Sequence, residues 1–229
     1  MSIVHVIAAH PDDEVLGCGG VIAKHVIQGD EVHVLILAEG ITSRGEKRDR
    51  ENQKTELSEL SRSANEAHHI LGSTSLKMLD FPDNRMDSVD LLDIIKVIEL
   101  ELTEKKTDTI YTHHQGDLNI DHRLTHQAVV TACRPIPNQK VKKILCYEVP
   151  SSTEWQTPNP EMAFVPNCFI NITETLTMKL NALRAYGGEM MEWPHSRSIL
   201  ALEHLSRWRG ASSGLDAAEA FMLVRKIIH

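Results

Sequence analysis

One histidine and three carboxylates stand within five residues in the run HPDDE, at positions 10 to 14. The run follows an apolar segment, Ile3–Ala9, which we expect to be a buried strand. Acidic groups crowded into one turn repel one another unless a cation lies between them. Helix capping explains each aspartate singly, but it does not explain His10 beside them. The run therefore predicts a cation site in which these side chains do chemistry.

A second polar stretch, HHQGDLNIDHRLTH at positions 113 to 126, follows another short apolar segment, Thr109–Thr112. In a doubly wound sheet, ligands bind in the crevice at the carboxyl ends of the strands, so we expect both stretches to face it. His10, Asp13 and His122 together supply two imidazoles and one carboxylate. This ligand set is usual for hydrolytic zinc and also suits iron(II). His126 lies one helical turn beyond His122 and fits a supporting role or an ordinary helical one.

The glycines at positions 17, 19 and 20 do not indicate a dinucleotide site. That fingerprint requires G-x-G-x-x-G directly after the strand, whereas these glycines come a full turn into the following helix. We expect them to let the helix approach the sheet closely.

The composition is that of a globular protein with a small or neutral ligand. The chain has 229 residues, a formal net charge of −8, 41% hydrophobic, 24% charged and 4% aromatic residues. Dispersed acidic charge and few aromatics argue against nucleic acid as the ligand. The four cysteines show no CxxC spacing, and no secretory segment or membrane span is evident. We expect one domain over residues 1–229 and a cytoplasmic location.

Apolar strand patterns alternate with helical ones, which predicts an α/β fold. The sheet should be mostly parallel, with helices on both faces and the metal site at the carboxyl ends of the strands. Expected strands are Ile3–Ala9, Glu31–Ala38, Lys77–Asp80, Thr109–Thr112 and Ile144–Glu148, and expected helices are Glu14–Gln28, Lys47–Leu71, Leu91–Leu102 and Asp121–Cys133. After a loop at Pro150–Pro166 come Cys168–Ile172, helices near Glu174–Tyr186 and Ser196–Arg209, and an apolar end, Phe221–Ile228.

The motifs carry a resemblance to a known family. HPDDE with Gly19 and Gly20 behind it, the run NIDHR at positions 119 to 123, and the weaker tail Arg209–Phe221 resemble the PIG-L/LmbE-like N-deacetylases. These include enzymes that deacetylate N-acetylglucosaminyl-phosphatidylinositol and the sugar precursors of mycothiol and bacillithiol. The resemblance implies a Rossmann-like sheet and a zinc-dependent hydrolase that removes an acetyl group from an N-acetylated sugar.

The same resemblance implies roles for individual residues. His10, Asp13 and His122 would bind the metal, and Asp12 would be the general base that takes a proton from a metal-activated water. The family's H-x-D-H motif begins with a histidine where this chain has Asn119, which can donate a hydrogen bond to an oxyanion but cannot deliver a proton. Asp121 is expected to orient a ligand or an imidazole from behind.

Two points stay open around the missing histidine. Either Asp12 serves as both base and acid, or a nearby imidazole, His114 or His126, supplies the proton. The tyrosine of the GxxYAE-like motif of some relatives is also absent, because Ala217 stands there.

Substrate contacts are expected from Arg44 and Asp83, which follow the second and third strands, and from His114 and His126 in the polar stretch after the fourth. Trp155, in the loop after the fifth strand, would stack on a sugar or simply pack. The substrate would be an N-acetylglucosamine-like sugar, free, nucleotide-linked or in a glycoconjugate. The alternatives are an amide of a thiol conjugate or another small amide, a phosphoester, or a binding module without turnover, against which the extra carboxylate of Asp12 argues. Relatives often assemble, which allows a homo-oligomer.

Overall fold

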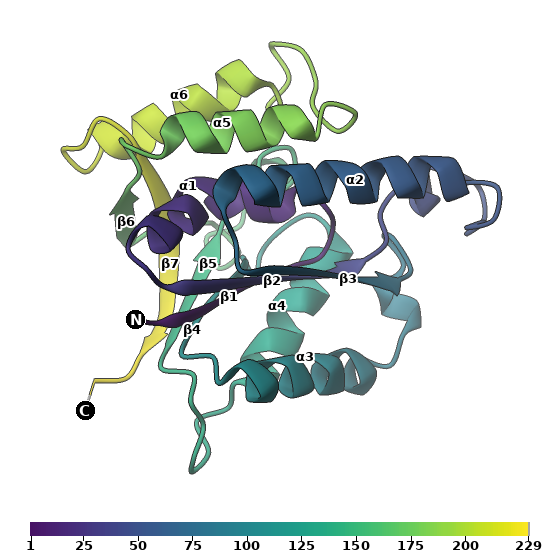
Figure 1. The fold of residues 1–229 in the computed structure, drawn as a ribbon, viewed down its shortest axis with the longest axis horizontal. Coiled ribbons are helices and arrows are strands. Elements are labelled where there is room, and N and C mark those ends of the chain that lie inside the picture. Colours follow the sequence, from purple (N-terminus) through teal and green to yellow (C-terminus); the bar gives the residue numbers. More distant parts are fainter. Residues whose placement is uncertain (229) are drawn as a thin grey trace.

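The computed structural model, which describes residues 1–228, is built on one seven-stranded sheet in the order β3-β2-β1-β4-β5-β7-β6 (Figure 1). Strands β1 to β5 run parallel, and β7 runs antiparallel between β5 and β6. The fold is thus the expected Rossmann-like α/β fold with a mostly parallel, mixed sheet. The strands are β1 (Ile3–Ala8), β2 (Glu31–Ala38), β3 (Ser75–Phe81), β4 (Thr109–His113), β5 (Lys143–Tyr147), β6 (Cys168–Asn171) and β7 (Ala218–Lys226).

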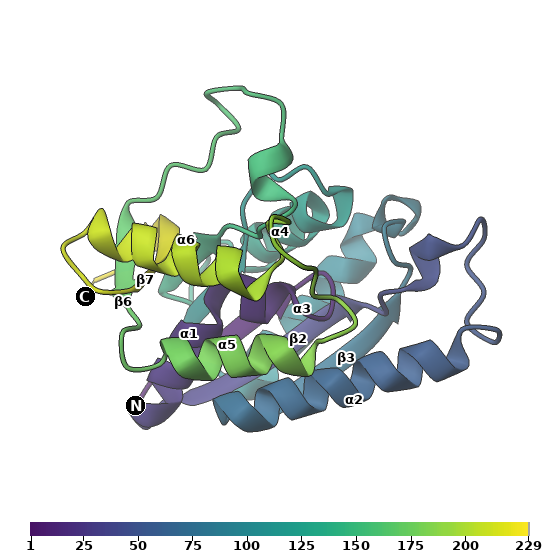
Figure 2. The same ribbon diagram turned by 90° about the horizontal axis from the view of Figure 1, so that it is seen from above.

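Helices cover both faces of the sheet, as Figure 1 shows from the side and Figure 2 from above. One face carries α1 (Asp13–Ile27), α2 (Lys54–Leu71), α5 (Leu176–Ala185) and α6 (Ile199–Ala211), and the other carries α3 (Leu91–Lys105) and α4 (Ile120–Ala132). Side chains of the central strand alternate between two cores: Val4 and Val6 pack on the first face and Ile7 on the second. Burial on both faces explains why β1 and β2 read as continuous apolar runs.

Helix α2 ends where expected but begins later than expected. Gly72 adopts a left-handed conformation, with φ of 78°, and stops the helix directly after Leu71. The expected start at Lys47 is wrong, because side chains hold the preceding segment in a loop. The guanidinium of Arg48 donates to the Glu39 carboxylate at 2.7 and 2.9 Å and to the main-chain oxygen of Asp80 at 2.6 Å.

The glycines of α1 do allow the close approach that we expected. A Cβ atom on Gly17 would lie 2.3 Å from the ring of Tyr147 on β5, and one on Gly20 would lie 2.8 Å from Ile172. The helix is also kinked at Cys18, whose φ of −148° and ψ of 26° are not helical. The carboxylate of Glu219, on β7, caps the part beyond the kink by accepting from the main-chain N–H groups of Gly20 (2.9 Å) and Val21 (2.7 Å).

All four cysteines carry free thiols, and three of them are buried. Within residues 1–228, no helix combines the length and the apolar character that crossing a membrane requires.

Candidate active site

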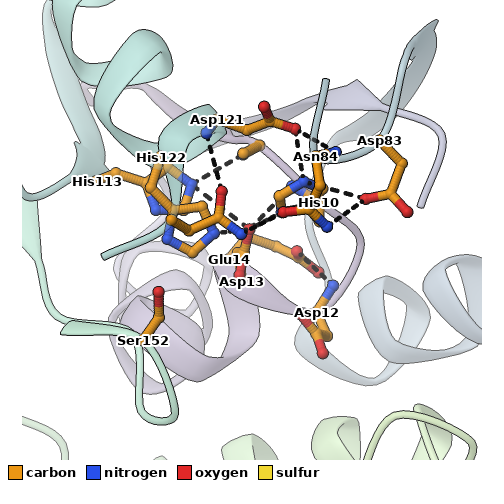
Figure 3. A network of polar contacts seen from close by, with 12 residues as sticks. His10, Asp12, Asp13, Glu14, Asp83, Asn84, His113, Asp121, His122 and Ser152 are labelled. Carbon is orange, nitrogen blue, oxygen red and sulfur yellow. Dashed lines mark hydrogen bonds and ion pairs between the residues drawn. The ribbon is translucent and has the colours of Figure 1, made fainter. Parts of the chain in front are cut away.

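The carboxyl ends of β1, β3 and β4 meet at a small polar cavity of about 180 Å³ (Figure 3). The turn after β1 contributes His10, Asp12 and Asp13, the loop after β3 contributes Asp83, and the start of α4 contributes His122. Parallel strands place these distant segments at one edge of the sheet. The cavity is lined by His10, Pro11, Asp12, Gly40, Ile41, Ser43, Arg44, Leu60, Asp83, Asn84, Asn119, His122, Ser151, Ser152, Glu189 and Arg197.

Three side chains converge as ligands of one cation would. Oδ2 of Asp13 lies 3.3 Å from Nδ1 of His10 and 3.1 Å from Nε2 of His122, and one ligand atom from each residue falls within 4.8 Å of the others. The second carboxylate oxygen of Asp13, Oδ1, is buried without a hydrogen bond among the described residues. A buried carboxylate oxygen left unpaired is costly, and a divalent cation at this point satisfies it. The residues present therefore fit a metal site.

A carboxylate stands behind each of the two imidazoles. Nε2 of His10 lies 3.0 Å from Oδ2 of Asp121, and Nδ1 of His122 lies 3.1 Å from Oδ1 of Asp117. Each imidazole thus has one nitrogen toward Asp13 and the other toward a buried acid. For His10 this contact is a hydrogen bond, which in metal-binding histidines fixes the tautomer and the ring orientation. Nδ1 of His122 lies close to Asp117 without hydrogen-bond geometry, so that contact is electrostatic.

Both supporting acids are themselves held in place. Asp121 accepts the main-chain N–H groups of Asn84 at 2.7 Å and Met86 at 3.0 Å. Asp117 accepts the hydroxyl groups of Ser152 and Thr153, the latter at 2.6 Å. His10, Asp83 and Asp121 form a second acidic cluster. Since both oxygens of Asp121 already accept N–H groups, we interpret this cluster as the support of His10 rather than as a second metal site.

The pKa values of the candidate ligands are shifted because these charged groups are buried close together. Burial lowers the pKa of His122, but the carboxylates of Asp13 and Asp117 outweigh it and raise this pKa to about 9. Burial raises the pKa of Asp13, yet the neighbouring imidazoles of His122 and His10 hold it well below its ordinary value. An incoming cation would therefore meet an ionised Asp13 and displace protons from the imidazoles.

Asp12 occupies the N-cap position of α1 but does not act as a cap. Its backbone is strained, with φ of 105° and ψ of −30°, and its side chain makes no capping hydrogen bond. Instead, Oδ2 lies 3.0 Å from Nη1 of Arg197. Burial raises the pKa of Asp12 well above its ordinary value, opposed by the charge of Arg197 and reinforced by that of Asp13. A carboxylate with a raised pKa beside a cation site suits proton transfer.

Glu14 holds this strained turn from beneath. It is fully buried, and its carboxylate accepts the Asp12 main-chain N–H at 3.1 Å and the Tyr186 hydroxyl at 2.8 Å. Nε2 of His68 lies 3.1 Å from the same carboxylate. The third acid of HPDDE thus points into the protein and supports the other two.

Asn119 caps α4 while lining the cavity. Its Oδ1 accepts the main-chain N–H of Asp121 at 2.8 Å, and its Nδ2 donates to Oδ1 of Asn84 at 2.7 Å. The side-chain amide nitrogen of Asn119 carries two N–H groups, and one of them remains to donate into the cavity.

The other expected substrate residues separate into two groups. Arg44 and Asp83 line the cavity, where Arg44 pairs with Glu189 at 2.7 Å and Asp83 accepts the Ser43 main-chain N–H at 2.9 Å. His114 and His126 do not line it. Nε2 of His114 lies 2.8 Å from the main-chain oxygen of Met162, and Nδ1 of His126 lies 2.9 Å from that of His113.

Asp117 and Arg197 belong to the site but were not singled out from the sequence. Asp117 lies in the polar stretch after β4, where a carboxylate five residues before His122 was the available signal. Arg197 lies between α5 and α6, far from either motif, and no pattern in the sequence marked it.

Comparison with known proteins agrees with this geometry. Residues 5–133 match the family model described as "GlcNAc-PI de-N-acetylase" (PIG-L). "Uncharacterized deacetylase YaiS" from Escherichia coli (strain K12) is 31% identical over 186 residues, which cover 79% of this chain and 88% of that protein. "Diacetylchitobiose deacetylase" from Thermococcus kodakarensis is 28% identical over 235 residues, which cover 95% of this chain and 81% of that protein.

A solved structure supports the fold. That of GalB, the 4-carboxy-2-hydroxymuconate hydratase from Pseudomonas putida KT2440, has a TM-score of 0.78 at 22% identity and covers 100% of this chain and 98% of that one. At this identity the likeness concerns the fold alone. The family match spans the motifs that build the site, including His10, Asp13 and His122. The chain belongs to the PIG-L/LmbE-like family and is a metal-dependent N-deacetylase.

Proposed function

We propose that this protein hydrolyses the acetamide of an N-acetylated sugar, with zinc held by His10, Asp13 and His122 and with Asp12 as general base. One observation carries the proposal. Three ligand atoms converge within 4.8 Å, and a fourth side chain, the carboxylate of Asp12, lines the same cavity without joining them. A site that only binds a metal has no use for a buried carboxylate that is not one of its ligands.

The chemistry divides between the ion and the chain. When bound, a divalent ion of this kind acidifies water and polarises a carbonyl oxygen. Asp12 accepts the proton of the attacking water. Nδ2 of Asn119 donates a hydrogen bond to the oxygen that becomes negative as the carbonyl is attacked. Asp121 and Asp117 keep the two imidazoles in their orientation.

Asp12 also returns the proton to the departing amine in this proposal. Among the described residues that line the cavity, His10 and His122 are the only imidazoles, and both are assigned to the metal. His114 and His126 do not line the cavity, and each lies beside a main-chain oxygen. The expectation that one of them replaces the missing histidine therefore loses its support.

The shape of the site favours a substrate with a group beyond the reacting sugar. The small cavity adjoins a second hollow of about 480 Å³, and the two share Arg44, Ser151, Glu189 and Arg197. Trp155, which is 53% exposed, lines the second hollow. An exposed indole beside a sugar site provides a flat apolar surface for a second ring. The diacetylchitobiose deacetylase relative fits a substrate of this class.

Acetate release tests the proposal directly. The protein, stripped with a chelator and reloaded with zinc or, without oxygen, with iron(II), is incubated with N-acetylglucosamine, a nucleotide-linked form of it and diacetylchitobiose. We expect acetate from at least one of them, none after stripping, and recovery with one metal. Reloaded protein that releases no acetate but cleaves a thiol-conjugate amide or a phosphoester would assign it to that other reaction.

A further inference from the structure

Arg197 joins three chain segments at the mouth of the cavity. It lies at the end of the loop between α5 and α6, and only 24% of its side chain is exposed. Nη1 is 3.0 Å from Oδ2 of Asp12 in the turn after β1, and Nε donates to Oγ of Ser151, after β5, at 2.8 Å. One planar guanidinium thus holds the HPDDE turn and the loop after β5 in a fixed relation.

The contact with Arg197 sets the orientation of the Asp12 carboxylate, as the other groups around Asp12 show. Apart from Arg197, the charged groups that act most strongly on it are the acids Asp13, Glu189 and Glu14, which repel it. Within residues 1–228, Arg197 is the only cation in hydrogen-bonding contact with the carboxylate, and no hydrogen bond reaches Oδ1. Oδ2 is therefore anchored, while Oδ1 is free on a side chain that lines the cavity.

A second arginine at the mouth does not duplicate this contact. Arg44 binds the Glu189 carboxylate through Nη2 at 2.8 and 2.7 Å. Glu189 and Arg197 lie in the same loop between α5 and α6, so this loop brings one negative and one positive side chain to the cavity. Glu189 is bound to Arg44, and Arg197 is bound to Asp12.

We propose that Arg197 is the positioning residue of the general base: it anchors Oδ2 of Asp12, with Ser151 as its second support, and thereby aims Oδ1 at the attacking water. This inference rests on the proposed function. Arg197 acts through Asp12 and needs no contact with the substrate. An error of about 1 Å in the placement of a catalytic group costs on the order of 100-fold in rate, and correct placement of the base is what the arginine supplies.

The test combines kinetics with a double-mutant cycle. In Arg197→Met we expect kcat to fall by about 10- to 100-fold with little change in KM or metal content. Arg197→Lys should recover part of the loss, because an ammonium can still reach Asp12 but cannot bridge to Ser151 as well. In an Asp12→Asn background, Arg197→Met should cost nothing further, since the carboxylate that it positions is gone.

Arg209 offers a matched control. It makes a similar pair with Glu148, at 2.8 and 2.6 Å, its side chain is 21% exposed, and it lies outside the small cavity. Arg209→Met should leave kcat unchanged. A kcat of Arg197→Met equal to that of the control, or the same loss in the Asp12→Asn background as in the wild type, would overturn the inference.

A crystal structure of metal-loaded Arg197→Met separates this inference from the proposed function. We expect the Asp12 carboxylate to leave its present orientation, with the metal ligands unmoved. A carboxylate that keeps its orientation without the arginine would refute the positioning role. This readout holds for any substrate, whereas failure of the proposed function would appear as a wild-type protein that releases no acetate.

Discussion

Asp12 and Asp13 are neighbours in the chain but meet opposite surroundings. Burial together with nearby acids raises the pKa of Asp12, although Arg197 opposes the rise, whereas the imidazoles around Asp13 outweigh its burial and lower its pKa. Two carboxylates whose pKa values are driven apart are suited to different tasks. The opposite pKa shifts agree with the proposed roles, in which Asp13 is a metal ligand and Asp12 carries the proton.

Substitutions at the two aspartates should have different effects. Asp12→Asn should lower kcat by at least the roughly 10²- to 10⁴-fold that a general base contributes, while metal stays bound. Asp13→Ala should lose metal and activity together. Acetate release and elemental analysis of the same samples measure both quantities, and exposed Asp80, at the edge of the sheet, provides Asp80→Asn as the control. Near-normal turnover in Asp12→Asn would remove Asp12 from the mechanism.

Asp117 should affect metal affinity more than chemistry. It stands 3.1 Å behind His122 and accepts the Ser152 and Thr153 hydroxyl groups. Loss of such a supporting carboxylate typically weakens metal binding or activity by about 10- to 100-fold. We expect Asp117→Asn to weaken metal binding by this factor, measured by competition with a chromogenic chelator, and excess metal should restore much of the activity. Unchanged metal affinity would contradict the supporting role.

At the scale of elements, close packing of α1 on the sheet fixes the position of the HPDDE turn. Gly17 faces the ring of Tyr147, and there is no room for a methyl group between them. Because Asp12 and Asp13 stand at the start of this helix, a displacement of α1 moves both.

Gly17→Ala should therefore destabilise the protein. Overpacking a tight contact costs about 1–3 kcal/mol, and we expect the free energy of unfolding in urea to fall by that amount. Gly188→Ala is the matched control, because a Cβ atom at Gly188 meets nothing within 4 Å. Equal free energies of unfolding for the two variants would show that α1 moves away from Tyr147 without loss of stability.

The sequence was most informative where the pattern of apolar strands followed by polar residues determines the position of a side chain. Strands β1 and β4 carry polar residues directly beyond their apolar runs, so parallel pairing brought His10, Asp13 and His122 together as expected. The late start of α2 was not predictable from helical propensity, because side-chain contacts of Arg48 across the loop decide it. Arg197 was missed for the same reason: its contact with Asp12 depends on the path of a loop.

At the scale of the whole molecule, a pair of buried histidines lies at the other end of the strands. His5 is 1% exposed, stacks on His33 with ring centroids 5.3 Å apart, and has Nδ1 2.7 Å from Oγ1 of Thr107. Burial, reinforced by the positive charges of His33 and nearby lysines, lowers the pKa of His5 to about 3. This end of the sheet therefore favours a neutral imidazole.

Acid should weaken the fold through His5. The pKa of His5 is near 6.5 in the unfolded chain and about 3 in the folded one. Between these values the unfolded state binds more protons, so the free energy of unfolding decreases as the pH is lowered. From pH 7 to pH 5 the loss is about 2 kcal/mol. In His5→Asn we expect the free energy of unfolding in urea to lose this contribution to its decrease between pH 7 and pH 5. A slope equal to that of the wild type would contradict the assignment.

The cap that Glu219 places on α1 has a consequence for how the protein is made. The helix that carries Asp13 is interrupted at Cys18, and two N–H groups beyond the break donate to the Glu219 carboxylate of β7, which lies 199 and 198 residues further along the chain. Translation delivers the HPDDE turn long before Glu219. A nascent chain that has not yet reached β7 would hold His10 and Asp13, the first of the proposed metal ligands, on an uncapped helix, and competence to bind the ion should arrive only after β7 has been made.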